Sequence, residues 1–521
     1  MKYPIGIQTF SEIIERGYVY VDKTSFVQTL KGGKYYFLSR PRRFGKSLLL
    51  STLEAYYEGR RDLFKGLALD RLTDDWEPRP VLHLDLNNGM YNSEKGLLEK
   101  LSFQLREWEK DYGLIENAGS TDETVSIRFG SLIKNLFERT GKRVVILIDE
   151  YDKPLLNTID RPELAECYRS TLKSFYSNLK TQDRYIEIAV ITGVARFSKV
   201  SIFSDLNNLE DISFSSEFSA ICGVTAEELP IYFGKGIQKL SDKLGKSEEE
   251  TVSLLKKLYD GYHFSMNSPD IYNPFSLINT FKKEDPGRYW FESGTPTYLV
   301  TLLSKINRPF SDIAPVEMDR MELESAGLLD SNPVPVFYQS GYLTIRDYDH
   351  DTESYILDYP NEEVKEGFLR FLMKSYIPDM MPGSGFTMPD FIRAVRDGKP
   401  EKFMRSMDSL VAGVPYTEKG SAESHFQNAV YLLFTLLGFF ARMEQRTSDG
   451  RIDITVETQQ RVYIFEFKID SSAEKAMAQI KEKEYWRPYV SSGKEIYLIG
   501  ANFETKTRRL SGWLIDAINR E

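Results

Sequence analysis

A short segment near the N-terminus, residues 34–57, combines the residue types that bind phosphate groups. It reads as an apolar strand, then the loop RPRRFGKS over residues 40–47, then a run with helical periodicity. Where a helix follows such a loop, the N–H groups of its first turn and its dipole attract an anion. Lys46 is placed to reach the phosphates, and the hydroxyl of Ser47 to bind Mg²⁺. The segment therefore predicts a site for a nucleoside triphosphate with Mg²⁺.

The loop departs from the usual pattern G-x-x-x-x-G-K-[ST] at its first position, where Arg40 stands instead of glycine. That glycine normally supplies an unhindered turn. Two interpretations stay open: the loop arginines compensate with charge, or nucleotide binding is weak or altered. The residues expected to contact the nucleotide from this loop are Arg40, Arg42, Arg43, Phe44, Gly45, Lys46 and Ser47.

Two carboxylates follow a second apolar run, RVVILIDEYDK over residues 143–153. Continuous aliphatic residues indicate a strand that is buried on both faces of a parallel sheet. Ligands bind beyond the carboxyl ends of such strands. We expect Asp149 to hold Mg²⁺, directly or through water, and Glu150 to polarise the attacking water.

A third apolar strand, over residues 186–192, ends in Thr192 and is followed by Arg196. Thr192 is expected to sense the γ-phosphate or to orient the water, and Arg196 to stabilise developing charge. An apolar strand that ends in Asp-Glu, or an isolated Gly-Lys-Ser, often occurs by chance. Found together and followed by a third such strand, they predict a P-loop fold, while hydrolysis as opposed to binding of ATP stays open.

A second group of chemically competent residues lies in a predicted β-hairpin over residues 450–468. With a four-residue turn, Asp453 faces Glu466, and Lys468 shares the face of Glu466 because side chains alternate along a strand. Opposed carboxylates repel unless a divalent cation lies between them, and Mg²⁺ prefers such oxygen ligands. The hairpin therefore predicts a metal site held by Asp453 and Glu466, with Lys468 positioning or activating the attacking water.

Helices on either side of this hairpin are expected to complete the site. The helix over residues 421–441 carries Glu423 near its start, and the helix after the hairpin carries Gln479. The alternative is a surface hairpin in which Asp453 and Lys468 form an ordinary ion pair. The strand that bears Glu466 is otherwise aromatic and aliphatic, which favours charges at the edge of a buried core over a surface hairpin.

The sequences RPRRFGKS, VVILIDEYD and ITGVARFSKVSIFSDLNNL resemble those of bacterial AAA-ATPase-like proteins whose ATPase module precedes a PD-(D/E)XK nuclease-type domain. The resemblance covers nearly the full chain, and family members similarly lack the first glycine of the loop. It implies a helical lid against the ATPase. Asp453, Glu466 and Lys468 match the core of the nuclease superfamily pattern. Glu423 matches its first-helix acid, and Gln479 matches a frequent helix residue.

The expected fold is α/β: a P-loop NTPase of AAA/ASCE type with a parallel sheet, a helical lid and a winged-helix-like segment, followed by a small α/β restriction-endonuclease-like domain. The 521 residues exceed what one core supports. The predicted divisions are 1–215 for the ATPase-like domain, 216–330 for the lid, 331–415 for the connector and 416–521 for the nuclease-like domain. Residues 337–360 read as a hairpin between helices, which suggests the winged-helix-like arrangement.

Composition indicates which binding partners and which cellular compartment to expect. The net charge of −10 belongs to residues 1–415, because residues 416–521 carry equal numbers of acidic and basic side chains. A neutral module is easier to place on a phosphate backbone than an acidic one. Two distant cysteines make a disulfide framework or zinc site improbable and fit a reducing cytoplasm. The longest apolar run, residues 429–441, is shorter than the ~20 residues that span a bilayer.

Two hypotheses follow. The leading one is an ATP-binding protein, expected also to hydrolyse ATP, coupled to a metal-dependent phosphodiesterase that uses Mg²⁺ or Mn²⁺ and takes DNA or RNA as its partner. The second is a nucleotide-sensing regulator or scaffold whose nuclease-like domain is non-catalytic and binds a partner. Arg40 and the acidic first 415 residues favour the second. No membrane is expected as a partner, and the sequence does not indicate an oligomeric state.

Overall fold

The computed structural model describes residues 1–114, 124–195, 202–203, 206–292, 313–325, 332–376, 388–412, 422–438, 442–448 and 451–518. The chain forms two compact units. The first comprises Met1–Ile306 and Pro315–Val364, and the second comprises Asn307–Ala314 and Lys365–Glu521. Within the described ranges, every helix is too short or too polar to cross a membrane. The finer division into four domains stays a prediction.

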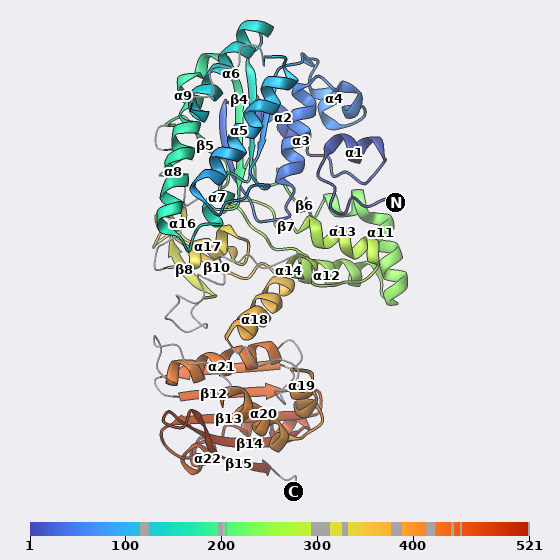
Figure 1. Cartoon of the computed structure of the whole chain (residues 1–521). Coiled ribbons are helices and arrows are strands. Elements are labelled where there is room, and N and C mark those ends of the chain that lie inside the picture. The colour runs from blue at the N-terminus through green and yellow to red at the C-terminus, as the bar shows by residue number, and fades with distance from the viewer. Residues whose placement is uncertain are drawn as a thin grey trace. The chain divides into compact units, whose positions relative to one another are not determined.

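The first unit is built on a parallel five-stranded sheet (Figure 1). Its strands are β1 (Tyr35–Ser39), β2 (Val81–Asp85), β3 (Val144–Asp149), β4 (Ile186–Gly193) and β5 (Glu210–Asp211). They lie in the order β2-β3-β4-β1-β5. Every residue of β1 and β3 is buried, as the aliphatic runs predicted. Because β3, β4 and β1 are neighbours, their carboxyl ends meet at one edge of the sheet.

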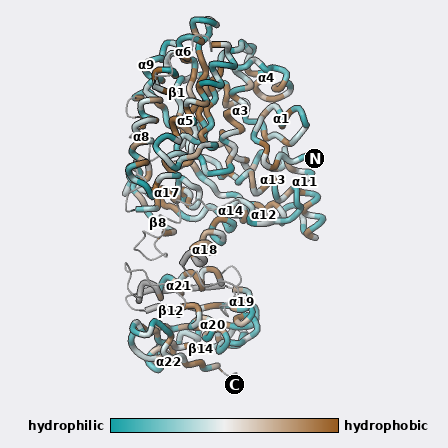
Figure 2. The backbone as a smooth tube through the Cα atoms, in the orientation of Figure 1, coloured by the Kyte–Doolittle hydropathy of each residue, from teal (hydrophilic) through white to brown (hydrophobic). Residues whose placement is uncertain are grey.

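Helices pack on both faces of this sheet, and the side chains of β2 show this because successive side chains along a strand point to opposite faces. Leu82 and Leu84 join a core with α5, α6 and α8, whereas His83 points to Glu54 of α3. Figure 2, in which the backbone is coloured by residue hydropathy, shows hydrophobic residues concentrated in these strands. The helices up to β5 are α1 (Phe10–Glu15), α2 (Ser25–Leu30), α3 (Lys46–Tyr57), α4 (Ala68–Leu72), α5 (Glu94–Asp111), α6 (Val125–Thr140), α7 (Lys153–Leu156), α8 (Pro162–Tyr176) and α9 (Asn178–Thr181), with 3₁₀ turns at Arg61–Phe64 and Asp183–Tyr185.

The predicted helical region follows the sheet. Its helices are α11 (Glu228–Leu244), α12 (Glu248–Tyr259), α13 (Pro274–Lys283) and α14 (Tyr289–Glu292), with a short antiparallel pair of β6 (Val224–Thr225) and β7 (Ile271–Tyr272). Ser247 caps α12: its side chain accepts the N–H of Glu250, whose carboxylate accepts the N–H of Ser247. The apolar faces of α11, α12 and α13 form their own core, which also takes in Tyr3, Val19 and Val21 of the N-terminal segment.

The predicted hairpin between helices is present as β9 (Thr344–Asp349) and β10 (Ser354–Asp358). A third strand, β8 (Val316–Asp319), pairs with β10 and was not predicted. Helices α16 (Arg320–Ser325) and α17 (Val334–Gln339) precede β9, and α18 (Glu362–Tyr376) follows β10. The chain passes from the first unit into the second within α18.

The second unit carries a five-stranded mixed sheet in the order β11-β12-β13-β14-β15. Its strands are β11 (Arg442–Ser448), β12 (Arg451–Glu457), β13 (Arg461–Ile469), β14 (Glu495–Glu504) and β15 (Arg509–Ile518), and its helices α19 (Met388–Arg396), α20 (Pro400–Ala412), α21 (Ala422–Leu437) and α22 (Ala473–Glu482), with a 3₁₀ turn at Arg487–Ser492. Only β13 and β14 pair in parallel, and α22 joins them and packs on both. The expected α/β fold with a small sheet domain at the C-terminus is confirmed.

Candidate nucleotide and metal sites

The phosphate loop runs from the end of β1 to the start of α3. Gly45 adopts a left-handed conformation (φ 99°, ψ 19°) directly before Lys46, the first residue of the helix. This conformation favours glycine, so the second glycine of the pattern has a clear backbone role here. Arg43 is also left-handed, with φ 67°, which marks the loop as tightly turned.

Lys46 is held inside this loop. Only 4% of the residue is exposed, and its Nζ donates to the carbonyl oxygens of Arg40 (3.1 Å) and Pro41 (3.3 Å). The carboxylate of Glu150 lies 3.8 Å from the same ammonium group. A buried cation whose neighbours are mostly neutral oxygens retains its attraction for an anion, since low exposure weakens screening.

Asp149 joins three segments that are distant in sequence. Its Oδ2 accepts a hydrogen bond from the hydroxyl of Ser47 (2.5 Å). Its Oδ1 accepts from the hydroxyl of Thr192 (2.6 Å) and from the N–H of Glu150 (3.0 Å). The structure thus brings together the predicted metal-binding pair Ser47 and Asp149, with the predicted sensing residue beside them. A hydroxyl and a carboxylate oxygen at this spacing are the hard donors that suit Mg²⁺.

Glu150 stands beside this cluster in a strained backbone conformation. Its φ of 53° is left-handed, which is uncommon for a residue with a β-carbon. Its side chain is 23% exposed and lines the cavity described below. The carboxylate is therefore accessible, as a group that polarises water must be.

Asp152 was not singled out from the sequence, although it lies in the same DEYD run. It is fully buried, and its Oδ2 accepts the N–H groups of Val194 (3.0 Å) and Ala195 (2.7 Å). Burial raises the pKa of its carboxyl to about 7, and the charge of Glu150 adds to that shift. Asp152 thereby ties the turn after β3 to the chain just beyond Thr192. Alternation within a motif gives no signal for such a contact between segments.

The structure places Arg40 differently from the expectation. Its guanidinium is buried and donates to the carbonyl oxygens of Ser39 (2.9 Å), Ser213 (2.9 Å) and Phe218 (3.0 Å). It also lies 4.1 Å from the ring centre of Phe264. Arg40 does not line the cavity, so it anchors the loop from behind and does not offer its charge to the phosphates directly.

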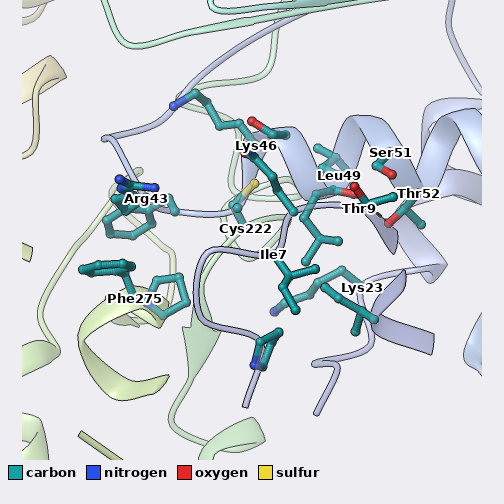
Figure 3. Close-up of a pocket in the computed structure, with 18 of the residues that line it drawn as sticks. Ile7, Thr9, Lys23, Arg43, Lys46, Leu49, Ser51, Thr52, Cys222 and Phe275 are labelled. Carbon is teal, nitrogen blue, oxygen red and sulfur yellow. Dashed lines mark hydrogen bonds between the residues drawn. The ribbon is translucent and has the colours of Figure 1, made fainter. Parts of the chain in front are cut away.

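The other predicted loop residues do line the cavity. The guanidinium of Arg43 lies 5.2 Å from the ring centre of Phe275, a contact visible in Figure 3. Phe44 is buried edge-on against Tyr262 and Phe264. The backbone carbonyl oxygen of Arg42 accepts a hydrogen bond from the indole N–H of Trp290 (2.9 Å). Arg196 lies outside the described residues.

A cavity of about 490 Å³ opens at the end of the phosphate loop. Its lining includes the polar residues Lys46, Ser47, Asp149 and Glu150. Apolar side chains from the N-terminal segment, α3 and residues 221–278 also line it: Ile7, Val19, Leu49, Ile221, Phe233 and Ile278. Figure 3 shows Ile7 and Leu49 close to the polar residues Thr9, Ser51 and Thr52. The N-terminal segment therefore forms part of the wall of this cavity. Its Lys23 pairs with Glu228 of α11 at 2.6 Å.

His83 and Glu54 form a further pair on the cavity wall that the sequence did not indicate. The imidazole Nδ1 of His83 lies 3.0 Å from the carboxylate Oε2 of Glu54. Burial alone would lower the pKa of His83. The hydrogen bond and charge of Glu54, with the charges of Asp149 and Asp85, outweigh burial and raise that pKa.

The carboxylate hairpin of the second unit has the predicted register. Asp453 pairs with Glu466, and Glu457 with Val462, between β12 and β13. Glu466 is fully buried, and its Oε1 accepts from Nζ of Lys468 (2.6 Å). Lys468 also donates to Oε1 of Gln479 on α22 (2.6 Å), and the Gln479 amide donates to the hydroxyl of Tyr485 (3.3 Å).

Three of the predicted residues in this second site are thus in contact: Glu466, Lys468 and Gln479. Asp453 is placed by its backbone opposite Glu466, and Glu423 lies in the first turn of α21; their side chains lie outside the described part of the chain. The buried carboxylate of Glu466 supplies oxygen atoms, which are the ligands that a hard cation prefers.

Comparisons with known proteins agree with this geometry. Residues 4–203 match the family described as "Predicted AAA-ATPase", and residues 421–513 match the PD-(D/E)XK nuclease superfamily. An uncharacterized protein in the vnfD 5′ region of Azotobacter chroococcum mcd 1 is 37% identical over 534 aligned residues, which cover 99% of both chains. The resemblance expected from the three motifs is confirmed. The chain therefore belongs to the family of AAA-ATPase-like proteins that carry a C-terminal PD-(D/E)XK nuclease superfamily domain.

Proposed function

We propose that the first unit binds and hydrolyses ATP with Mg²⁺, and that the second unit is a metal-dependent nucleic-acid phosphodiesterase under its control. The observation that carries the first half is the hydrogen-bonded cluster of Ser47, Asp149 and Thr192, of which Ser47 and Asp149 line a cavity that Glu150 also lines. Phosphoryl transfer needs positioning and charge neutralisation, and these residues supply both.

Each residue of the first site has a role in this proposal. Lys46 would exchange the loop carbonyls for phosphate oxygens. Ser47 and Asp149 would hold Mg²⁺, which would neutralise phosphate charge. Glu150 accepts a proton from the attacking water, and Thr192 holds the Asp149 carboxylate in place. The apolar side chains of Ile7 and Leu49 in the cavity lining suit the flat face of a base.

The second unit is supported by its buried carboxylate and its lysine. Glu466, with Asp453 opposite in register, would hold Mg²⁺ or Mn²⁺, which polarises the scissile phosphate. Lys468 is fixed between Glu466 and Gln479, so its ammonium group can orient a water molecule and offset developing charge. DNA and RNA both present the phosphodiester that this arrangement would cleave.

Nucleotide binding is tested with Lys46→Ala. We expect the dissociation constant for Mg·ATP to rise roughly 10- to 100-fold, because one charge-assisted contact contributes about 1.5–3 kcal/mol. Lys31→Ala is the matched control: that lysine binds Asp75 and Tyr56 and does not line the cavity. Equal affinity in both variants and the wild type would refute the proposed site.

Cleavage is tested with labelled DNA and RNA in Mg²⁺ or Mn²⁺, with and without ATP. Glu466→Gln should abolish cleavage and leave ATP affinity unchanged, since the change lies in the other unit. A folded wild type that cuts neither substrate under any of these conditions would refute the second half of the proposal.

The second candidate function is a nucleotide-sensing regulator. Its supporting observation is that Arg40 commits its charge to backbone carbonyls and not to the cavity. Binding of ATP without turnover by the wild type, equal to that of Glu150→Gln, would favour this candidate.

A further inference from the structure

The phosphate loop is held from outside by segments that lie beyond residues 4–203, the part that matches the ATPase family. The carbonyl oxygen of Arg42, in the middle of the loop, accepts the indole N–H of Trp290 at 2.9 Å, across 248 positions of sequence. Trp290 itself is 5% exposed and packs edge-on against Tyr342 at 5.2 Å. Its indole therefore has little freedom to leave the loop carbonyl.

Trp290 is fixed in turn by a buried carboxylate. Its backbone N–H donates to Oε1 of Glu363 at 2.9 Å, and Glu363 is 0% exposed. The other oxygen of Glu363, Oε2, accepts the hydroxyl of Ser276 at 2.7 Å. Ser276 is adjacent to Phe275, whose ring faces the guanidinium of Arg43.

These contacts form a closed path around the loop. Arg42 reaches Glu363 through Trp290, and Arg43 reaches Glu363 through Phe275 and Ser276. Glu363 is the second residue of α18, the helix in which the chain passes from the first unit into the second. A buried carboxylate that accepts two hydrogen bonds is costly to displace, so the path is stiff.

From this geometry we infer that Trp290 and Glu363 are positioning residues for the phosphate loop and link its conformation to the start of α18. The inference rests on the proposed nucleotide site. In loops with a first glycine, the backbone itself adopts the phosphate-binding shape. Here Arg40 stands at that position, and the shape is imposed by partners from distant segments. Since coupling is reciprocal, an occupied loop must also favour one arrangement of Trp290 and Glu363.

The first test measures Mg·ATP affinity in Trp290→Phe, which keeps an aromatic ring and removes the indole donor. We expect the dissociation constant to rise about tenfold (about 1.4 kcal/mol). Trp76→Phe is the matched control, because the Trp76 indole also donates to a carbonyl, that of Thr73 at 3.1 Å, away from the cavity. Its dissociation constant should stay within about twofold of the wild type.

The second test compares Glu363→Ala with Glu363→Gln. Glutamine keeps an oxygen for the N–H of Trp290 and an amide that donates to Ser276, so it should recover most of the affinity lost in Glu363→Ala. If Glu363 had a purely structural role, both variants would unfold at a lower temperature than the wild type, and their affinities for Mg·ATP would be equal.

The third measurement is made on the wild type, so it does not depend on whether a variant folds. In the wild type labelled with ¹⁵N-tryptophan, the indole N–H signal of Trp290 should shift on addition of Mg²⁺ and a non-hydrolysable ATP analogue, and that of Trp76 should not. If nucleotide binds while the Trp290 signal stays in place, or if Trp290→Phe binds as tightly as Trp76→Phe, the inference is refuted and the proposed site survives. If the wild type binds no nucleotide, both fall.

Discussion

The buried carboxyl of Asp152 makes the stability of the first unit depend on pH. Its pKa is raised from 3.8 to about 7, so the folded state binds a proton that the unfolded state has lost between those values. The contribution is fully present below pH 3.8 and is lost as pH rises through about 7. Asp152→Asn, which cannot ionise, should therefore gain stability relative to the wild type across this window, by about 4 kcal/mol at most.

Urea unfolding of the two proteins at pH 5 and pH 8 measures this difference. The asparagine keeps one oxygen for the N–H groups of Val194 and Ala195, so the variant isolates charge from shape. The same relative stability at both pH values would mean that the carboxyl is not held neutral by its surroundings.

A second residue-scale prediction concerns Thr192, whose hydroxyl orients the Asp149 carboxylate. Thr192→Val has nearly the same shape but lacks the donor. We expect the turnover rate for ATP to fall roughly 10- to 100-fold with KM little changed, because misplaced groups lose rate before binding. The control in steady-state assays is Thr171→Val, which removes a hydroxyl that donates a hydrogen bond to the backbone carbonyl oxygen of Cys167 within α8. A higher KM with unchanged turnover would assign Thr192 to binding instead.

At the residue scale, sequence patterns identified the site residues whose positions are set by a single strand or loop. Asp149 and Thr192 lie at the carboxyl ends of β3 and β4, and Ser47 follows β1 through the phosphate loop. Because these strands are parallel neighbours, the sequence was enough to predict that the three residues lie together. Arg40 was predicted to contact the nucleotide, and its role as a backbone anchor was not predicted, nor was the contact of Trp290 with the loop. Their partners lie 173 and 248 positions away, and periodicity carries no information on such pairs.

At the element scale, helix α22 positions Gln479 against Lys468 because it packs closely on β14. A β-carbon at Gly500 would lie 2.5 Å from the backbone nitrogen of Met477 and 2.9 Å from the carbonyl oxygen of Ala473. Gly500→Ala should therefore push α22 away, lower the free energy of unfolding by about 1–3 kcal/mol and reduce any nuclease activity. Gly512→Ala on neighbouring β15 meets nothing within 4 Å and should leave both nearly unchanged. Denaturant unfolding and cleavage assays on the two variants decide it.

The hairpin illustrates what an element-level prediction can reach. The register of Asp453 opposite Glu466 followed from turn length and alternation alone. Strands β11, β14 and β15 were not predicted. Their antiparallel partners are close in sequence, since β11 pairs with β12 and β14 with β15. For β11 the missing signal is apolar alternation, which residues 442–448 do not clearly show.

At the scale of the whole molecule, we expect the nucleotide state of the first unit to control cleavage by the second. Glu150→Gln should respond to ATP by changing its cleavage rate without turnover, whereas Lys46→Ala should not respond to ATP at all. The wild type should respond while ATP lasts. Cleavage time courses of all three proteins with and without ATP measure this. One rate for every combination would show that the two units act independently.

A single turnover of γ-labelled ATP on the wild type and Glu150→Gln tests whether Ser47, Asp149 and Glu150 form an ATP-hydrolysing site. We expect both proteins to retain ATP with similar stoichiometry and phosphate release to be at least about 100-fold slower in the variant. Failure of both proteins to retain ATP, or release from the variant as fast as from the wild type, would contradict it.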